Sequence, residues 1–219
     1  LAEPTRAFQL ATQLADLLFT DLCNEVLATA GLEAATARDI ARIGLLNDAA
    51  GALVMPYRRF AASAMELRHD IEQLQHRYNA SFEQVSHRLS TLQRPGARGV
   101  PFYFVRVDQA GNITKRHSST RFQFARFGGA CPLWNVHEAF GHPGRILVQV
   151  AEMPDGVRYL CVGRSIVKRS GNFLRPNRQY AIGIGCEVAH ADKVVYSEGL
   201  SLDGAAVPVG VSCRICERP

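Results

Sequence analysis

A pair of cysteines, Cys213 and Cys216, lies close to the last residue, Pro219, at the spacing C-x2-C. Two thiolates at this spacing can bind one metal centre, but Zn²⁺ or an iron–sulfur cluster needs about four ligands. The other cysteines are scattered singly: Cys23, Cys131, Cys161 and Cys186. The missing ligands would therefore come either from distant cysteines that the fold brings in or from residues beyond Pro219.

Arginines on predicted strand faces are the second candidate for chemistry. The period of two along a strand places Arg164 on the apolar face of Leu160 and Val162. A charge on a core face is rare unless it is paired. Arg164 should therefore contact either a buried carboxylate or an anionic ligand, and Arg106 repeats the pattern behind Phe104.

Two more arginines, Arg58 and Arg59, follow Pro56 and offer further donors. Guanidinium groups with aromatic neighbours suit a phosphorylated ligand that carries a purine. The sequence contains no phosphate-binding glycine motif and no visible nucleophile–base pair. His137 and His142 are five residues apart, one more than a zinc-protease helix requires, so this chemistry is not expected.

Composition sets the broad class. The 219 residues are 47% hydrophobic and 21% charged, which is ordinary for a soluble globular protein. A net charge of +5 favours an anionic partner. No signal peptide or membrane-length apolar run is visible, and the irregular cysteines predict a reducing cytoplasm. Because the chain starts at Leu1 and not at methionine, we expect it to be part of a larger protein.

The first part of the chain, residues 1–94, has helical periodicity. Leucines from Leu10 to Leu22 recur at helical spacing in the first helix. We expect helices over residues 5–29, 36–55, 57–68, 70–78 and from 81 onwards. Two capping boxes mark helix starts, Thr36 with Asp39 and Ser81 with Gln84.

A loop rich in glycine and proline, residues 93–99, ends the helical pattern, and the period then changes to two. We expect strands over residues 102–107, 113–116, 121–127, 145–151, 158–167, 180–188 and 193–196. A short helix is expected within 133–140. The predicted fold class is α+β, with a helical subdomain over 1–94 and an antiparallel-sheet domain over 99–219.

Several runs of residues resemble known families. The segment 45–57 is similar to a helix of ImmA/IrrE-type metallopeptidase-like domains, but the zinc helix H-E-x-x-H does not precede it. Longer motifs closely resemble the short-chain fatty-acyl-CoA regulators, which are bacterial transcription factors, over residues 40–219. These motifs are Ser81–Val85, Leu92–Pro95, Gly99–Phe102, Arg106–Asp108, Ala110–Asn112, Gly129–Trp134 and Cys213–Cys216.

The resemblance implies the effector-sensing region of a cytoplasmic regulator, not an enzyme. Such a region binds CoA or a short-chain acyl-CoA and modulates operator binding by an N-terminal helix-turn-helix that is absent here. The resemblance also implies a homo-oligomer, no membrane partner and an iron–sulfur cluster at the cysteine motif. The family's third cysteine in that motif is missing, so Cys131 and Cys186 are the internal candidates to complete it.

On this reading the phosphates of CoA would contact arginines and the acyl tail would enter an apolar pocket. The predicted ligand-binding residues are Arg58, Arg59, Arg106, Arg164, Phe102, Tyr103 and Trp134. One alternative is a CoA- or thiol-dependent enzyme that uses Cys131 or Cys186. Another is a nucleic-acid-binding module, because the short helices within 70–93 have the form of a helix-turn-helix.

Overall fold

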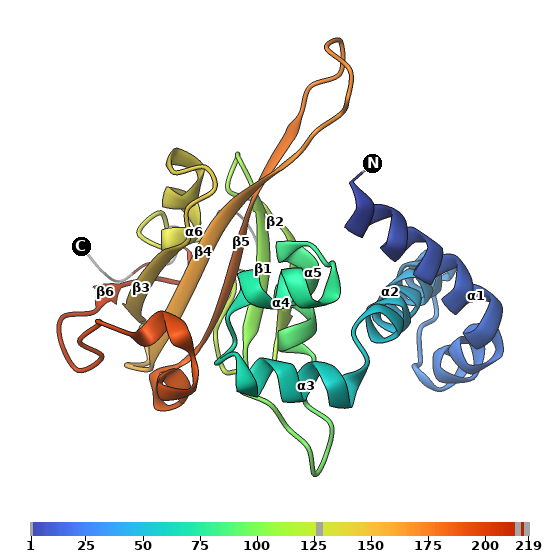
Figure 1. Ribbon diagram of the computed structural model, residues 1–219, viewed down its shortest axis with the longest axis horizontal. Helices are drawn as coiled ribbons and strands as arrows, with labels where there is room; N and C mark the ends of the chain where they lie inside the picture. Colours follow the sequence, from blue (N-terminus) through green and yellow to red (C-terminus); the bar gives the residue numbers. More distant parts are fainter. Residues whose placement is uncertain (1, 126–128, 213–215, 217–219) are drawn as a thin grey trace.

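The computed structural model describes residues 2–125, 129–212 and 216. An N-terminal helical hairpin comes first, followed by three shorter helices that lie against a six-stranded sheet (Figure 1). The α+β class predicted from the sequence is confirmed. No helix in the described part of the chain is both long and apolar enough to cross a bilayer.

The N-terminal hairpin consists of α1 (Glu3–Thr29) and α2 (Ala35–Val54). Small side chains, Ala11, Ala15 and Cys23, form the buried seam of α1, whereas the leucines at helical spacing point outward and are exposed. Arg42 of α2 closes the seam by donating to Asp16 at 2.8 Å. The period in the sequence therefore identified the helix, but the leucine face is not the face that packs against α2.

Three helices cover one face of the sheet: α3 (Tyr57–Glu66), α4 (Ile71–Tyr78) and α5 (Phe82–Ser90). Ser81 and Gln84 form the predicted capping box at the start of α5. The box predicted from Thr36 and Asp39 is wrong. Helix α2 already begins at Ala35, without a side-chain cap among the described residues, so Thr36 lies inside its first turn.

The sheet has the order β2-β1-β5-β4-β3-β6, and neighbouring strands are antiparallel except β3 and β6. Its strands are β1 (Tyr103–Asp108), β2 (Ile113–Ser118), β3 (Leu147–Glu152), β4 (Arg158–Lys168), β5 (Arg178–Glu187) and β6 (Val207–Pro208). On β5, a Cβ atom at Gly185 would lie 2.4 Å from the carbonyl oxygen of Leu160. This glycine therefore allows the backbones of β4 and β5 to approach closely at this point.

Two predicted strands are not formed. Described residues 121–125 are irregular, because Phe122 packs into an aromatic cluster with Tyr103 at a ring distance of 4.1 Å. Residues 193–196 lie at the junction of the short 3-10 helices η2 (Val188–Lys193) and η3 (Val195–Ser197). Here the backbone N–H of Val194 donates to Ala191 O within the turn, and that of Val195 donates to Arg68 O at 2.8 Å, so no strand ladder forms. The short helix predicted within 133–140 is present as α6 (Asn135–Glu138) and η1 (Ala139–Gly141).

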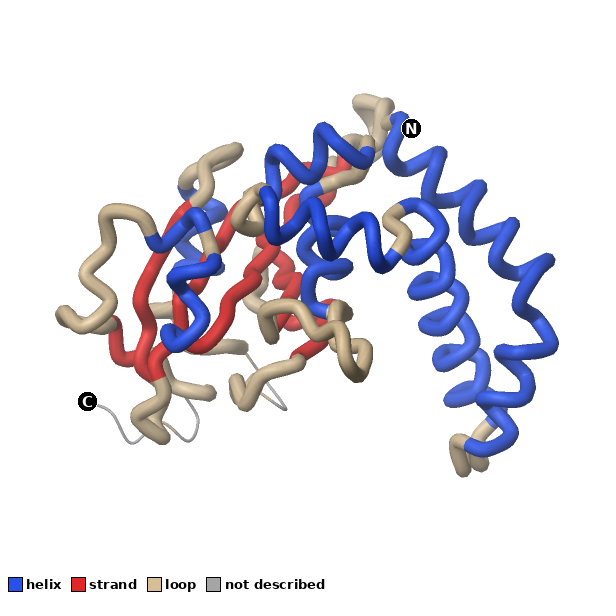
Figure 2. The backbone as a smooth tube through the Cα atoms, turned by 60° about the horizontal axis from the view of Figure 1, so that its bottom comes forward, coloured by secondary structure: helices blue, strands red, loops and turns tan. Residues whose placement is uncertain are grey.

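The sheet separates two hydrophobic cores. Figure 2 shows the strands of the sheet in red and the helices beside them in blue. On the side of α3–α5, Phe102 and Phe104 pack with the helices, and Ile182 of β5 joins them. On the other side, Tyr103 packs with Trp134 and with the irregular segment before α6. The alternation along β1 thus sends even-numbered side chains to the helices and odd-numbered side chains to the aromatic core.

Candidate anion-binding site

A row of cationic residues crosses four strands on the helix-covered face of the sheet. Lys115 of β2 lies opposite Arg106 of β1, Arg106 lies opposite Ile182 of β5, and Ile182 lies opposite Arg164 of β4. Directly opposed residues point to the same face, and adjacent strands are ~4.8 Å apart. Arg106 and Arg164 are therefore about 10 Å apart at the backbone, on either side of an apolar residue.

Glu83, in the first turn of α5, lies over one end of this row. Its Oε1 accepts from Arg106 Nη1 at 2.8 Å and lies 3.4 Å from Lys115 Nζ, while its Oε2 is 2.9 Å from Lys168 Nζ. Burial opposes ionisation of Glu83, but the bond from Lys168 and the three nearby charges outweigh it and lower its pKa. One carboxylate thus faces three cations, and the cluster keeps a surplus of two positive charges.

Arg164 contacts a carboxylate from the neighbouring helix. Its Nη1 is 2.9 Å from Oε1 of Glu72 on α4, and its guanidinium lies 5.2 Å from the centre of the Phe82 ring. The sequence left a buried carboxylate and an anionic ligand as alternatives. The structure shows a carboxylate, but the Glu72 side chain is 54% exposed, so it is a surface partner and not a buried one.

Tyr180 of β5 provides an aromatic surface beside the cluster. The Arg106 guanidinium lies 4.7 Å from the centre of its ring, and Lys168 Nζ lies 5.5 Å from it. Sequence reasoning did not select Tyr180, Lys115, Lys168 or Glu83. For Lys115 a signal was available in the hairpin register, which places it opposite Arg106, because cross-strand neighbours on one face interact.

Arg58 and Arg59 lie apart from this row in the structure. Both are exposed in the first turn of α3. That turn is tied to the loop before β1, because Tyr57 Oη accepts from the backbone N–H of Arg94 at 2.9 Å and donates to Ala97 O at 2.8 Å. The four predicted arginines therefore do not form one cluster.

The three predicted aromatic residues are all buried, but on different sides of the sheet. Phe102 lies on the helix side, where its ring is 5.5 Å from that of His69. Tyr103 and Trp134 lie on the other side, 5.7 Å apart. The structure therefore does not bring the three side chains to one pocket, because adjacent residues on a strand point to opposite faces.

The cysteines do not form a common site in the described chain. Cys213 lies outside the described residues, and Cys216 is exposed. Cys131 is buried in the aromatic core, whereas Cys186 is buried on the helix side of the sheet. No group of three or more His, Cys, Asp or Glu side chains in the described ranges could hold a metal ion. The internal cysteines thus do not fit a cluster that includes both.

A hollow of about 620 Å³ lies at the turn between α1 and α2. Leu27, Arg38 and Arg42 are among its lining residues, and none of the predicted site residues is. It is therefore separate from the cation row.

Comparisons with known proteins agree with this architecture. Residues 91–219 match the family model described as "Short-chain fatty acyl coenzyme A regulator, C-terminal", and residues 1–90 match the "IrrE N-terminal-like domain". A solved structure described as a Mycobacterium tuberculosis transcriptional regulator is 51% identical, with a TM-score of 0.95, and the match covers 100% of this chain and 67% of that one.

Two curated relatives are similar to this chain over nearly its whole length. The "Propionyl-CoA carboxylase regulator" of Cereibacter sphaeroides is 62% identical over 99% of this chain and 47% of its own length. The "HTH-type transcriptional regulator PrpR" of Mycobacterium tuberculosis is 52% identical over 97% of this chain and 44% of its own length. Both of these relatives are named as regulators.

More narrowly, the chain belongs to the short-chain fatty acyl-coenzyme A regulator family. It spans about half the length of the curated relatives that it matches.

Proposed function

We propose that the chain is the effector-sensing region of a transcriptional regulator and that it binds CoA or a short-chain acyl-CoA at the cation row. The observation that supports this most is the surplus of positive charge where three cations surround Glu83. A phosphate group would find charged donors here that the protein's own carboxylates do not neutralise. The family description names the same chemical class of effector.

The geometry suggests how a phosphorylated ligand would bind. Arg106 and Arg164 offer planar forks about two strand spacings apart, which suits two separate phosphate groups of one ligand. Tyr180 and Phe82 already stack against these guanidinium groups and hold them in place. The adenine and acyl ends of the ligand would extend along the surface beyond the row.

The same contacts provide a way to signal binding. The carboxylates that now bind the row come from two helices, Glu72 from α4 and Glu83 from α5. A ligand phosphate that takes over Arg164 or Lys168 would release these carboxylates and change the energy of the helix layer relative to the sheet. A ligand shifts a conformational equilibrium only through such differential contacts. We propose that operator binding by the longer protein responds to this change.

The rival function is a thiol-dependent enzyme. Burial raises the pKa of the Cys186 thiol to about 12, and burial has the same effect on Cys161. At neutral pH both groups are thiols and not the nucleophilic thiolates. This weakens the enzymatic reading for Cys186, and the named relatives are regulators.

Titration calorimetry with CoA and with acetyl-, propionyl- and butyryl-CoA tests the proposal. Binding should also raise the melting temperature as the ligand concentration increases. Arg106→Gln should weaken binding, whereas Arg98→Ala, an exposed change in the loop before β1, should not. Arg58→Ala with Arg59→Ala tests whether α3 makes a second contact. Absence of heat with all four ligands, or turnover of an acyl-CoA, would contradict the proposal.

We further propose that the intact regulator is a cytoplasmic homo-oligomer and that its metal site uses Cys213 and Cys216. The described cysteines do not supply the remaining ligands, so these would come from a longer protein. Anaerobic purification of a version extended past Pro219, followed by iron and sulfide analysis, checks the metal site. Light scattering of the same protein checks the oligomeric state. A monomer without iron or zinc would reject both.

A further inference from the structure

The hairpin between β4 and β5 forms an arm that stands away from the body of the molecule (Figure 1). The ladder ends with Lys168 opposite Arg178, and residues 169–177 close the arm. Its tip carries two large apolar residues: Phe173 is fully exposed and Leu174 is 85% exposed. Exposed aromatic and aliphatic side chains at the end of a projecting arm indicate a contact with a partner.

Hydrogen bonds within the arm give its tip a defined shape. The backbone N–H of Ser170 donates to Asn177 Oδ1 at 2.9 Å, and Ser170 Oγ donates to Arg175 O at 2.6 Å. The backbone N–H of Leu174 donates to Asn172 Oδ1 at 2.9 Å. The apolar side chains are therefore presented outward by an organised loop, which lowers the entropy that binding would cost.

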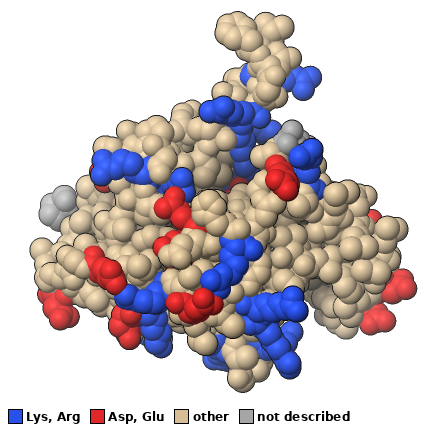
Figure 3. Space-filling model, viewed as in Figure 1, with Lys and Arg blue, Asp and Glu red and all other residues tan. Residues whose placement is uncertain are grey.

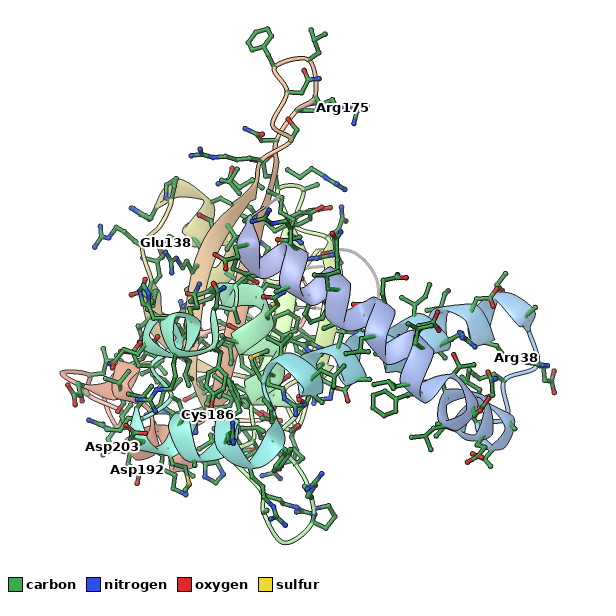
Figure 4. The ribbon with its side chains drawn as sticks, turned by 45° about the vertical axis from the view of Figure 1, so that its right-hand side comes forward. Arg38, Glu138, Arg175, Cys186, Asp192 and Asp203 are labelled. Carbon is green, nitrogen blue, oxygen red and sulfur yellow. The ribbon has the colours of Figure 1, made fainter. Side chains whose placement is uncertain are left out.

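The arm is uniformly cationic. Residues 156–186 contain six arginines and lysines and no aspartate or glutamate. Figure 3 shows Lys and Arg side chains along the arm beneath its apolar tip, and Figure 4 shows Arg175 on the arm, away from the body. Arg169, Arg175 and Arg178 are exposed and form no ion pair with any described residue. Their charges are available to an anionic partner.

We propose that this arm binds duplex DNA, with its three free arginines on the phosphates that flank the minor groove and Phe173 and Leu174 inserted at a base step. A two-stranded ribbon can enter a DNA groove, and apolar side chains of minor-groove proteins insert between base pairs. The density of positive charge without any acid matches a polyphosphate better than a protein surface of mixed charge. The arm begins one residue after Lys168, whose ammonium group contacts Glu83 in the proposed acyl-CoA site.

DNA binding by the arm does not depend on acyl-CoA binding. The present 219-residue protein is titrated into a fluorescent 30-base-pair duplex at several salt concentrations, and anisotropy is measured. We expect the protein to bind the duplex with an affinity that falls steeply as the salt concentration rises. Changing Arg169, Arg175 and Arg178 to alanine should reduce the slope of log K against log salt by about 2.7, because each phosphate contact contributes about 0.9.

The matched control removes the same charge elsewhere. Arg6, Arg98 and Arg145 are exposed on other parts of the surface, and changing these three to alanine should leave most of the slope intact. The double change Phe173→Ala and Leu174→Ala should keep the slope but reduce the unstacking that 2-aminopurine fluorescence reports. All three variants should melt near the parent temperature, since the changed side chains lie outside the hydrophobic cores.

Three results would overturn the proposal. The first is no salt-dependent retention of duplex even at low salt. The second is an equal loss of slope in the control, which would indicate a generally basic surface. The third is a dimer, seen by light scattering, that the Phe173→Ala and Leu174→Ala change dissociates, which would assign the arm to a second copy. Effector calorimetry on the same samples shows separately whether acyl-CoA binds.

Discussion

Arg106 Nη1 on β1 lies 2.8 Å from Glu83 Oε1 at the start of α5, and this pair joins the sheet to the helices that cover it. The Glu83 side chain is only 11% exposed, yet Lys115 and Lys168 also reach its carboxylate. A carboxylate this buried would be costly alone, and the surrounding cations stabilise its charge. The same carboxylate occupies donors that an anionic effector would use.

Replacing this carboxylate should have opposite effects on stability and on binding. Glu83→Gln removes the negative charge that faces three cations and replaces one acceptor oxygen by an NH2 donor, so the free energy of unfolding at pH 7 should fall by about 1–3 kcal/mol. Affinity for CoA should rise, because a competitor for the cations has been removed. Urea unfolding and calorimetry measure the two effects. The matched change Glu72→Gln removes a half-exposed partner and should alter stability by less than about 1 kcal/mol.

The stability difference between the parent and Glu83→Gln should depend on pH. The pKa of Glu83 is lower in the folded chain than in the unfolded one. Its contribution is therefore present above the unfolded-state pKa and is lost as pH falls through the folded-state pKa. The two proteins should converge in strongly acidic buffer. A difference that stays constant with pH would mean that the carboxylate charge does not hold the cluster.

A substitution at Arg164 can distinguish an anion-binding role of this residue from a structural one. Arg164→Lys keeps the charge but loses the planar fork that now bonds to Glu72 and stacks on Phe82. Binding of CoA should weaken by about tenfold or more, equivalent to roughly 1.4 kcal/mol, while the fold persists. Calorimetry and thermal melting measure both, with Arg98→Lys as control. If the variant unfolds, or binds as the parent does, Arg164 has only a structural role.

Gly185 should be the most sensitive glycine of the sheet. A methyl group there would lie 2.4 Å from Leu160 O and 2.7 Å from the Tyr103 ring, and a backbone oxygen cannot move cheaply. Gly185→Ala should therefore destabilise the protein by about 2–3 kcal/mol in urea unfolding. Gly44 in α2 has no atom within 4 Å of such a methyl group, so Gly44→Ala should be neutral or stabilise the helix by up to about 1 kcal/mol. Equal effects would show that crowding at β5 is unimportant.

His87 should make the fold sensitive to mild acid. Burial, with the charges of Lys115 and His117, lowers its pKa from 6.5 to about 4. The unfolded chain then binds the proton more readily, so stability is retained above about pH 6.5 and is lost as pH falls toward about 4. This group should account for a loss of about 2–3 kcal/mol over that window.

The measurement is unfolding free energy against pH for the parent and for His87→Gln, which should have a smaller slope. His76 is exposed on α4, so His76→Gln should follow the parent. The interpretation fails if the two glutamine variants have the same slope. It also fails if the parent is equally stable at both ends of the window.

The sequence by itself determined the elements that depend on local interactions. The helices over most of residues 1–94, the capping box at Ser81 and the hairpin that follows Arg106 arise from side-chain periods, caps and turn residues that act within a few positions. The α+β class and the family also follow from the sequence. Segment 193–196 shows the limit of local rules. Its apolar residues fit a strand pattern, whereas its backbone forms short 3-10 turns, and Val195 N–H donates to the distant Arg68 O.

Only the tertiary structure decided which charged residues meet. Lys115, Arg106 and Arg164 lie on strands that become neighbours through the order β2-β1-β5-β4, and Glu83 comes from a helix that packs over them. No local rule specifies that order, because strand pairing depends on how distant segments bury their apolar faces together. The same pairing placed Tyr103 across the sheet from the arginines with which the sequence had grouped it.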